Sequence, residues 1–100
     1  MTPAEFNQSV RARPQPPDGL SAALQALWWM ARGDWDRAHT VAQEDASREG
    51  SWVHAHLHRV EGDEGNAGYW YARAGRPPAH HGLEAERDAI VAALLAGRQA

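Results

Sequence analysis

The sequence predicts an all-α fold from three observations: its composition, the spacing of its apolar residues and an internal repeat. Alanine accounts for 20 of the 43 hydrophobic residues, whereas Val, Ile and Thr together contribute 8 residues to the chain. Helices favour Ala, Leu, Arg and Glu, and strands favour β-branched residues. We therefore expect a single helical domain in these 100 residues.

Residues 1–19 are expected to form an extended, proline-rich N-terminal arm outside the helical domain, which spans residues 20–100. Three prolines block a helix in this segment, and a turn pair follows them: Pro14, Pro16, Pro17 and Asp18-Gly19. The side chains of Phe6 and Val10 can still hold the arm against the domain by packing on its surface.

The first two expected helices follow the arm. Apolar residues recur at intervals of three and four from Leu20 to about Arg32, which is the pattern of one helix face. Gly33 ends this helix, and Asp34 caps the next by accepting from free backbone N–H groups. The second helix begins at Trp35 and fades over residues 47–50.

Three further helices complete the expected set of five. Ser51 is the predicted cap of the third, which ends at Gly62. Asp63 caps the fourth, and Gly75 closes it, with two prolines beyond. The last helix runs from about Leu83 to Leu95 and begins with three carboxylates that complement its dipole: Glu84, Glu86 and Asp88.

An internal repeat relates the two halves of this pattern. Gly33-Asp34 recurs 29 residues later as Gly62-Asp63, and Ala38 corresponds to Ala67 at the same offset. Each half is a helix, a Gly-Asp turn and a second helix, and such a unit cannot bury its apolar face alone. We therefore expect two stacked helix-turn-helix hairpins in a solenoid-like arrangement, with the fifth helix capping the open end.

The repeat resembles the tetratricopeptide-repeat superfamily, including its shorter Sel-type relatives. The resemblance is carried in the second half by Ala55, Gly62-Asp63, Ala67, Tyr71, Ala74 and Pro77-Pro78, and in the first half by Ala26, Gly33-Asp34-Trp35 and Ala38. The first half is a degenerate copy, because Ala42 replaces the aromatic residue and Asp45 the second alanine. The resemblance covers about residues 20–78; it implies a helical solenoid and recognition of a protein or peptide, and it transfers no catalytic residues.

Histidines on the third helix suggest a second kind of site. His54, His58 and Glu61 lie at i, i+4 and i+7, so they share one helix face. Two histidines four residues apart on a helix can chelate a divalent metal ion, and Glu61 can add a ligand or orient an imidazole. The motif of zinc hydrolases is absent, because Ala55 stands where its glutamate would be.

Two placements of this face remain open. The apolar line Val53, Leu57 and Val60 turns His54 and His58 toward solvent or a groove. The tetratricopeptide resemblance implies instead that they face the second helix, where they converge with His39 in a partly buried cluster. A third interpretation is purely structural, with each imidazole satisfied by a hydrogen-bond partner such as Gln43, Glu61 or Asp36.

The repeat offset also predicts a composite surface. His54, His58 and Glu61 correspond to Gln25, Trp29 and Arg32 of the first helix, and equivalent positions of stacked hairpins lie on neighbouring helices. We expect an ion pair between Arg32 and Glu61 and a ring stack between Trp29 and His58. Aromatic, arginine and histidine groups on a rigid face suit the capture of a peptide or a small ligand.

Charge and the remaining motifs exclude several classes of protein. Ten Arg against thirteen Asp and Glu give a net charge of -3 with no basic block, which argues against nucleic-acid binding. The longest apolar run, Ala89 to Ala96, is too short to span a membrane, and no signal peptide is evident, so a cytoplasmic protein is expected. Disulfides and thiolate metal sites are excluded because there is no cysteine.

The sequence thus supports two hypotheses of function. In the first, the chain is a helical-repeat module that binds a protein, a peptide or a second copy of itself through Gln25, Trp29, Arg32, His54, His58 and Glu61. In the second, His39, His54 and His58, with Glu61, bind a divalent metal or perform acid–base chemistry on a small molecule. No catalytic residue is assigned.

Overall fold

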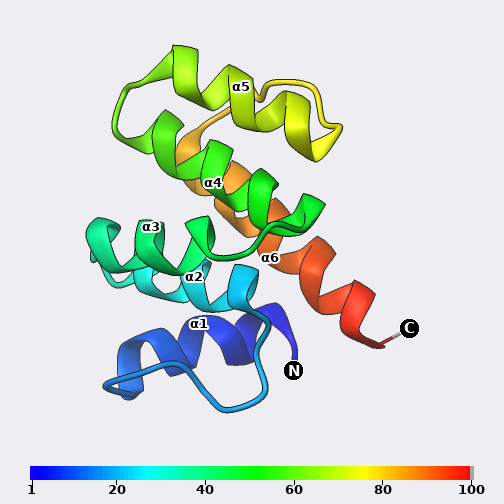
Figure 1. Cartoon of the computed structure of the whole chain (residues 1–100). Coiled ribbons are helices and arrows are strands. Elements are labelled where there is room, and N and C mark those ends of the chain that lie inside the picture. The colour runs from blue at the N-terminus through cyan, green and yellow to red at the C-terminus, as the bar shows by residue number, and fades with distance from the viewer. Residues whose placement is uncertain (100) are drawn as a thin grey trace.

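The computed structural model describes residues 1–99, and every regular element among them is an α-helix (Figure 1). The helices are α1 (Pro3–Ala12), α2 (Ala22–Ala31), α3 (Trp35–Gln43), α4 (Arg48–Val60), α5 (Glu64–Ala74) and α6 (Leu83–Gln99). The predicted all-α class is confirmed, whereas the predicted number of five helices is wrong. None of these helices combines the length and the apolar character that a bilayer span requires.

The additional helix is α1, which lies inside the segment expected to be an extended arm. Thr2 caps it in a reciprocal capping box, since its hydroxyl accepts from the backbone N–H of Glu5 and the Glu5 carboxylate accepts from the backbone N–H of Thr2. Pro3 fits the first turn, where its missing N–H needs no partner. The helix ends before the prolines that were expected to prevent it, so those prolines only terminate it.

The two Gly-Asp turns have the same conformation, as the internal repeat predicts. Gly33 and Gly62 adopt positive φ angles of 85° and 87°, which glycine tolerates without strain. The side chains of Asp34 and Asp63 each accept a hydrogen bond of 3.1 Å from the backbone N–H three residues later. These turns join α2 to α3 and α4 to α5 as two helical hairpins.

Helix α4 begins earlier than the sequence pattern suggests. Its cap is Ser47, whose hydroxyl accepts from the N–H of Gly50 at 3.0 Å, and Ser51 is buried inside the helix. A Cβ at Gly50 would lie 2.4 Å from the carbonyl oxygen of Asp45. Gly50 therefore allows the connection from α3 to pass close to α4, because it has no side chain to block that connection.

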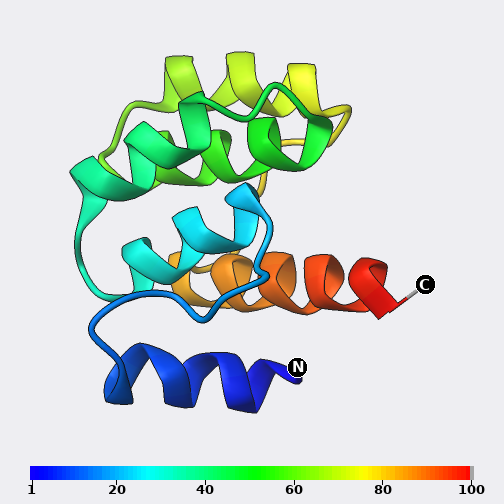
Figure 2. The same ribbon diagram turned by 60° about the horizontal axis from the view of Figure 1, so that its bottom comes forward.

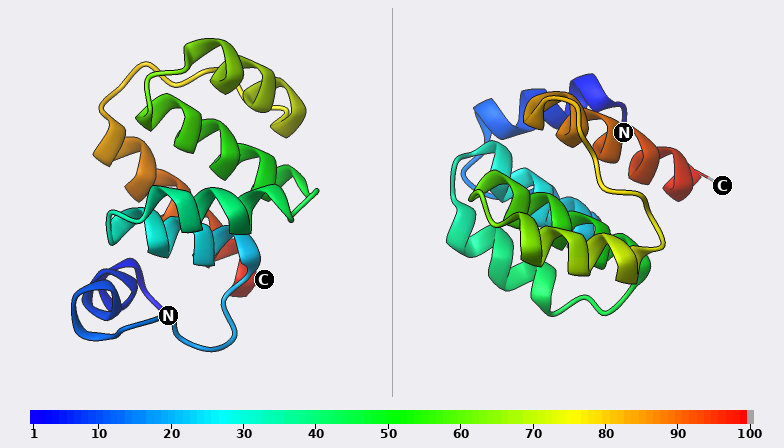
Figure 3. Two further views of the ribbon diagram at one scale, coloured as in Figure 1. Left: turned by 60° about the vertical axis from the view of Figure 1, so that its left-hand side comes forward. Right: turned by 90° about the horizontal axis from the view of Figure 1, so that it is seen from above.

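The helices form three layers, which the right-hand view of Figure 3 shows from above, and Figure 2 shows α6 next to α2 and above α1. Helices α2 and α4 lie in the middle, α3 and α5 cover one face of this pair, and α1 and α6 cover the other. Helix α6 therefore packs across α1, α2 and α4, a position that differs from the expected cap on the end of the second hairpin. The largest fully buried side chains of the middle layer are Leu24, Leu27, Trp28 and Leu57.

Candidate metal centre

Three histidines meet where the two hairpins contact each other. His39 lies on α3, and His54 and His58 lie one turn apart on α4, which packs against α3. The side chains of His54 and His58 are buried, with 4% and 9% of their surface exposed, and His39 is half-buried. Of the two placements open from the sequence, the structure has the one in which the α4 histidines face α3.

The three imidazole rings are within direct contact distance. The Nε2 atoms of His54 and His39 are 2.9 Å apart, which is a hydrogen bond whose donor depends on the tautomers. One ring nitrogen from each of His39, His54 and His58 lies within 4.8 Å of the others. The predicted histidine cluster is therefore confirmed.

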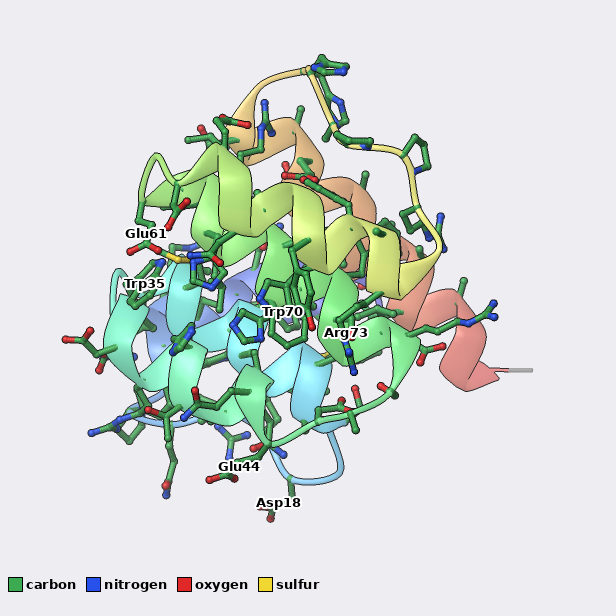
Figure 4. All side chains as sticks on the ribbon, turned by 45° about the horizontal axis from the view of Figure 1, so that its top comes forward. Asp18, Trp35, Glu44, Glu61, Trp70 and Arg73 are labelled. Atoms are coloured by element: carbon green, nitrogen blue, oxygen red, sulfur yellow. The ribbon has the colours of Figure 1, made fainter. Side chains whose placement is uncertain are left out.

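Two tryptophans enclose this His39–His54–His58 cluster. The indole of Trp70 stacks on His54, with ring centres 3.9 Å apart and an interplanar angle of 12°, and that of Trp35 stacks on His39 at 4.8 Å and 10°. The indole N–H of Trp35 donates to the carbonyl oxygen of Leu57 at 2.8 Å, which fixes its ring. Figure 4 labels Trp35 on α3 and Trp70 on α5, with Glu61 beside Trp35. The imidazoles of His54 and His39 are thus each stacked on one tryptophan.

Burial keeps the imidazoles of His39 and His54 uncharged near neutral pH. Burial, together with the proximity of His39 and His58, lowers the pKa of His54 to about 4. Burial, together with the proximity of His58, also lowers the pKa of His39, and the carboxylates of Glu61 and Asp36 oppose this shift only in part. These two imidazoles are therefore neutral at pH 7, and each has one unprotonated ring nitrogen.

Two further features of the cluster concern the Nδ1 atoms of His58 and His54. The Nδ1 atom of His58 lies 2.6 Å from a carboxylate oxygen of Glu61, which orients the ring and directs its Nε2 away from that carboxylate. The Nδ1 atom of His54 is buried and has no hydrogen-bond partner among the residues that the structure describes. A second group of His58, Glu61 and Asp63 also has ligand atoms within 4.8 Å of one another, and it shares His58 with the cluster.

The first-helix half of the predicted composite surface lies elsewhere. The side-chain amide of Gln25 donates to the carbonyl oxygen of Leu20 at 2.8 Å. The Arg32 guanidinium donates to the carbonyl oxygens of Val10 and Arg13. The expected Arg32–Glu61 ion pair is wrong, because the end of α1 and the residue after it provide carbonyl acceptors for Arg32.

The predicted stack of Trp29 on His58 is also wrong. The Trp29 ring packs edge-to-face on Trp28 at 5.0 Å, and the Arg37 guanidinium lies over it at 4.2 Å. The tryptophan that packs against His58 is Trp35, in an edge-to-face contact with ring centres 6.1 Å apart. Recognition of a protein or peptide through the composite surface stays a prediction, without the two contacts expected to build it.

A buried polar network that the sequence analysis missed centres on Glu86. One of its carboxylate oxygens accepts from His56 Nδ1 at 2.7 Å and from Arg59 at 3.1 Å, and the other accepts from the hydroxyl of Tyr71. Glu86 lies in the first turn of α6 as expected, but 2% of its surface is exposed, so it has a role in the core besides the one that the sequence pattern assigned to it at the helix end. The available signal was its position four residues before the buried Ile90, on the apolar face of the helix.

Comparisons with known proteins add no relative. A scan of protein-family models, a search of curated proteins and a search of solved structures each find no match to this chain.

Proposed function

We propose that this protein binds a divalent transition-metal ion through His39, His54 and His58. The observation that carries the proposal is the convergence of three imidazole nitrogens within 4.8 Å of one another, on two helices that pack together. Imidazole nitrogen is a preferred ligand of Zn²⁺, Cu²⁺ and Ni²⁺. A three-histidine site leaves a further coordination position for water or another ligand.

The distances are compatible with coordination after a small adjustment. Metal–nitrogen bonds of about 2.0–2.1 Å in a tetrahedral site place the ligand nitrogens about 3.3 Å apart. The Nε2 atoms of His39 and His54 are 2.9 Å apart. For both Nε2 atoms to bind one metal ion, the ring that donates in this hydrogen bond must carry its proton on Nδ1 instead. The two Nε2 atoms must also separate by about 0.4 Å, which side-chain rotation of the half-buried His39 can provide.

The surroundings also favour a metal ion. His54 has a pKa of about 4, so no proton must leave it when a metal binds at pH 7. The hydrogen bond of 2.6 Å between His58 and Glu61 resembles the carboxylate–histidine pairs that orient metal ligands. Because α3 and α4 belong to different hairpins, a bound ion would cross-link the two hairpins and stabilise the fold.

The test is a titration of the metal-free protein with Zn²⁺, Ni²⁺ and Co²⁺, followed by calorimetry, by thermal unfolding and by the Co²⁺ absorption spectrum. We expect one ion per chain. At a metal concentration about 100 times the dissociation constant, we expect a gain of about 2.7 kcal/mol in unfolding free energy. His39→Gln should weaken binding about 100-fold or more, and Glu61→Gln about 10-fold or more.

A matched control uses the two other histidines of the connection between α5 and α6. The double variant His80→Gln/His81→Gln removes two imidazoles from exposed positions, whereas His39→Gln removes one from the cluster. The double variant should leave the metal affinity unchanged. The proposal is wrong if the wild-type protein takes up no stoichiometric metal, or if His39→Gln binds as tightly as the wild type. The first outcome would leave the cluster a structural set of stacked rings.

A further inference from the structure

A groove of about 670 Å³ lies at the end of α4 opposite to Glu61. It is bounded by the starts of α2 and α4, the connection from α3, the end of α5 and the last turns of α6. The residues that matter for its chemistry are Arg48, Trp52, Ala74, Arg76, Ala93 and Leu94. We call it the Arg48–Arg76 groove.

The apolar part of the groove is built into the core. Ala74 is buried, and Trp52 and Leu94 are half-buried side chains that pack against the core. Trp52 and Arg76 also line a second hollow of about 450 Å³ beneath the connection from α5 to α6. Trp52 and Arg76 therefore border both hollows.

Two arginines at this groove lack an anionic partner. The Arg76 guanidinium lies over the Trp52 ring at 3.8 Å, and Arg48 Nη1 is 3.9 Å from the point where a Cβ of Gly75 would lie. Both cations thus lie beside the end of α5. Neither forms an ion pair with the side chains of residues 1–97, in contrast to Arg59 and Arg37, which pair with carboxylates.

The carboxylates at the groove do not neutralise these arginines. An oxygen of Asp45 accepts from the backbone N–H of Ser47 at 2.9 Å, and Glu49 is exposed. The N-terminal end of α4 also favours a negative charge here, whereas the C-terminal end of α5 opposes it. The groove therefore has two arginines on its lining, and the guanidinium of one of them, Arg76, lies over the Trp52 ring.

We infer that the Arg48–Arg76 groove binds a small organic anion, namely a carboxylate or phosphate attached to an apolar or aromatic body. A guanidinium group donates paired hydrogen bonds to either anion. Trp52 and Leu94 would cover the apolar body, as in most small-molecule sites. The inference is independent of the metal centre, because the groove contains none of the three histidines.

The experiment follows the indole N–H resonance of Trp52 by NMR in protein kept metal-free with a chelator. Trp52→Phe assigns the resonance. The probes are benzoate and phenyl phosphate, their bodiless counterparts acetate and inorganic phosphate, and the cation benzylamine. We expect saturable shifts with benzoate or phenyl phosphate, binding weaker by about tenfold with acetate or phosphate, and no shift with benzylamine.

Charge variants locate the anion. Arg48→Gln and Arg76→Gln should each weaken binding of the aromatic anion about tenfold. Arg73→Gln is the matched control, because Arg73 is also exposed and lies over an aromatic ring, that of Trp70 at 5.3 Å, but does not line the groove. It should leave binding unchanged.

Three results would overturn the inference. The first is the absence of a Trp52 shift at about 10 mM of either aromatic anion. The second is an equal shift with benzylamine, which would show contact with the apolar surface alone. The third is unchanged binding in both arginine variants. Benzoate and phenyl phosphate tested side by side decide whether the groove prefers a carboxylate or a phosphate.

Discussion

Glu86 stays ionised in the core because three side chains donate hydrogen bonds to its carboxylate. Burial alone raises the pKa of a carboxyl group, but the hydrogen bonds from His56, Tyr71 and Arg59 outweigh burial and lower the pKa of Glu86 to about 2. The donors lie on α4 and α5, so the carboxylate ties α6 to the second hairpin. Arg59 also donates to the backbone carbonyl of His81, which anchors the connection before α6.

Removal of this charge should destabilise the protein strongly. We expect Glu86→Gln to lower the unfolding free energy by about 3–5 kcal/mol, because it leaves the buried Arg59 cation without its carboxylate. Urea denaturation at pH 7 measures the change. Glu84→Gln is the control, since the Glu84 side chain is 85% exposed, and it should stay within about 0.5 kcal/mol of the wild type. Equal effects of the two substitutions would contradict the role assigned to Glu86.

At the scale of an element, α1 is part of the core. Its Phe6 side chain is fully buried, and the hydroxyl of Ser9 accepts from the indole N–H of the buried Trp28 at 3.0 Å. The Arg32 side chain, at the end of α2, adds hydrogen bonds to the carbonyl oxygens of Val10 and Arg13. Helix α1 therefore covers one side of α2 and gives the ring N–H of Trp28 a partner.

The substitution Phe6→Ala tests this docking. We expect a loss of about 3–5 kcal/mol in unfolding free energy, because the change leaves a cavity between α1 and the core. Gln8→Ala, at an exposed position of the same helix, should change the stability by less than about 0.5 kcal/mol. Urea denaturation monitored by tryptophan fluorescence distinguishes the two. If both variants unfold at the wild-type midpoint, α1 does not contribute to the folded state.

At the scale of the whole molecule, the His39–His54–His58 cluster couples stability to pH. The pKa of His54 falls to about 4 on folding from its ordinary value of 6.5, so the unfolded chain binds more protons between these pH values. Unfolding free energy must therefore fall as the pH is lowered through this window. The lowered pKa of His39 adds a change of the same sign.

The size and the window of this effect can be measured. Without metal, we expect the protein to lose about 3 kcal/mol of unfolding free energy between pH 6.5 and pH 4, the equivalent of the His54 shift. His54→Gln should flatten the profile in this range. The contribution of Glu86 is lost at lower pH, from about 4.5 to about 2, because its pKa is lowered on folding. An unchanged slope in His54→Gln would exclude His54 as its source.

Local patterns in the sequence are enough to predict the helical hairpins. The Gly-Asp turns, the cap at Asp63 and the left-handed Gly75 depend on backbone preferences within a few residues, and the structure has each of them. The Thr2–Glu5 capping box is equally local, so α1 is predictable from the sequence, and the prolines that follow it affect only the end of the helix. The buried Ala38 and Ala67 also lie where the repeat places them.

Contacts between helices distant in the sequence required the tertiary structure. Helical spacing puts His54 and His58 on one face of α4, but the packing of α3 on that face brings His39 to 2.9 Å from His54. Glu86 meets His56 and Tyr71 for the same reason, since α6 crosses the middle layer instead of following α5. Short-range backbone preferences thus determine where each helix begins and ends. The choice of partner for each polar side chain depends on layer packing, which no local pattern encodes.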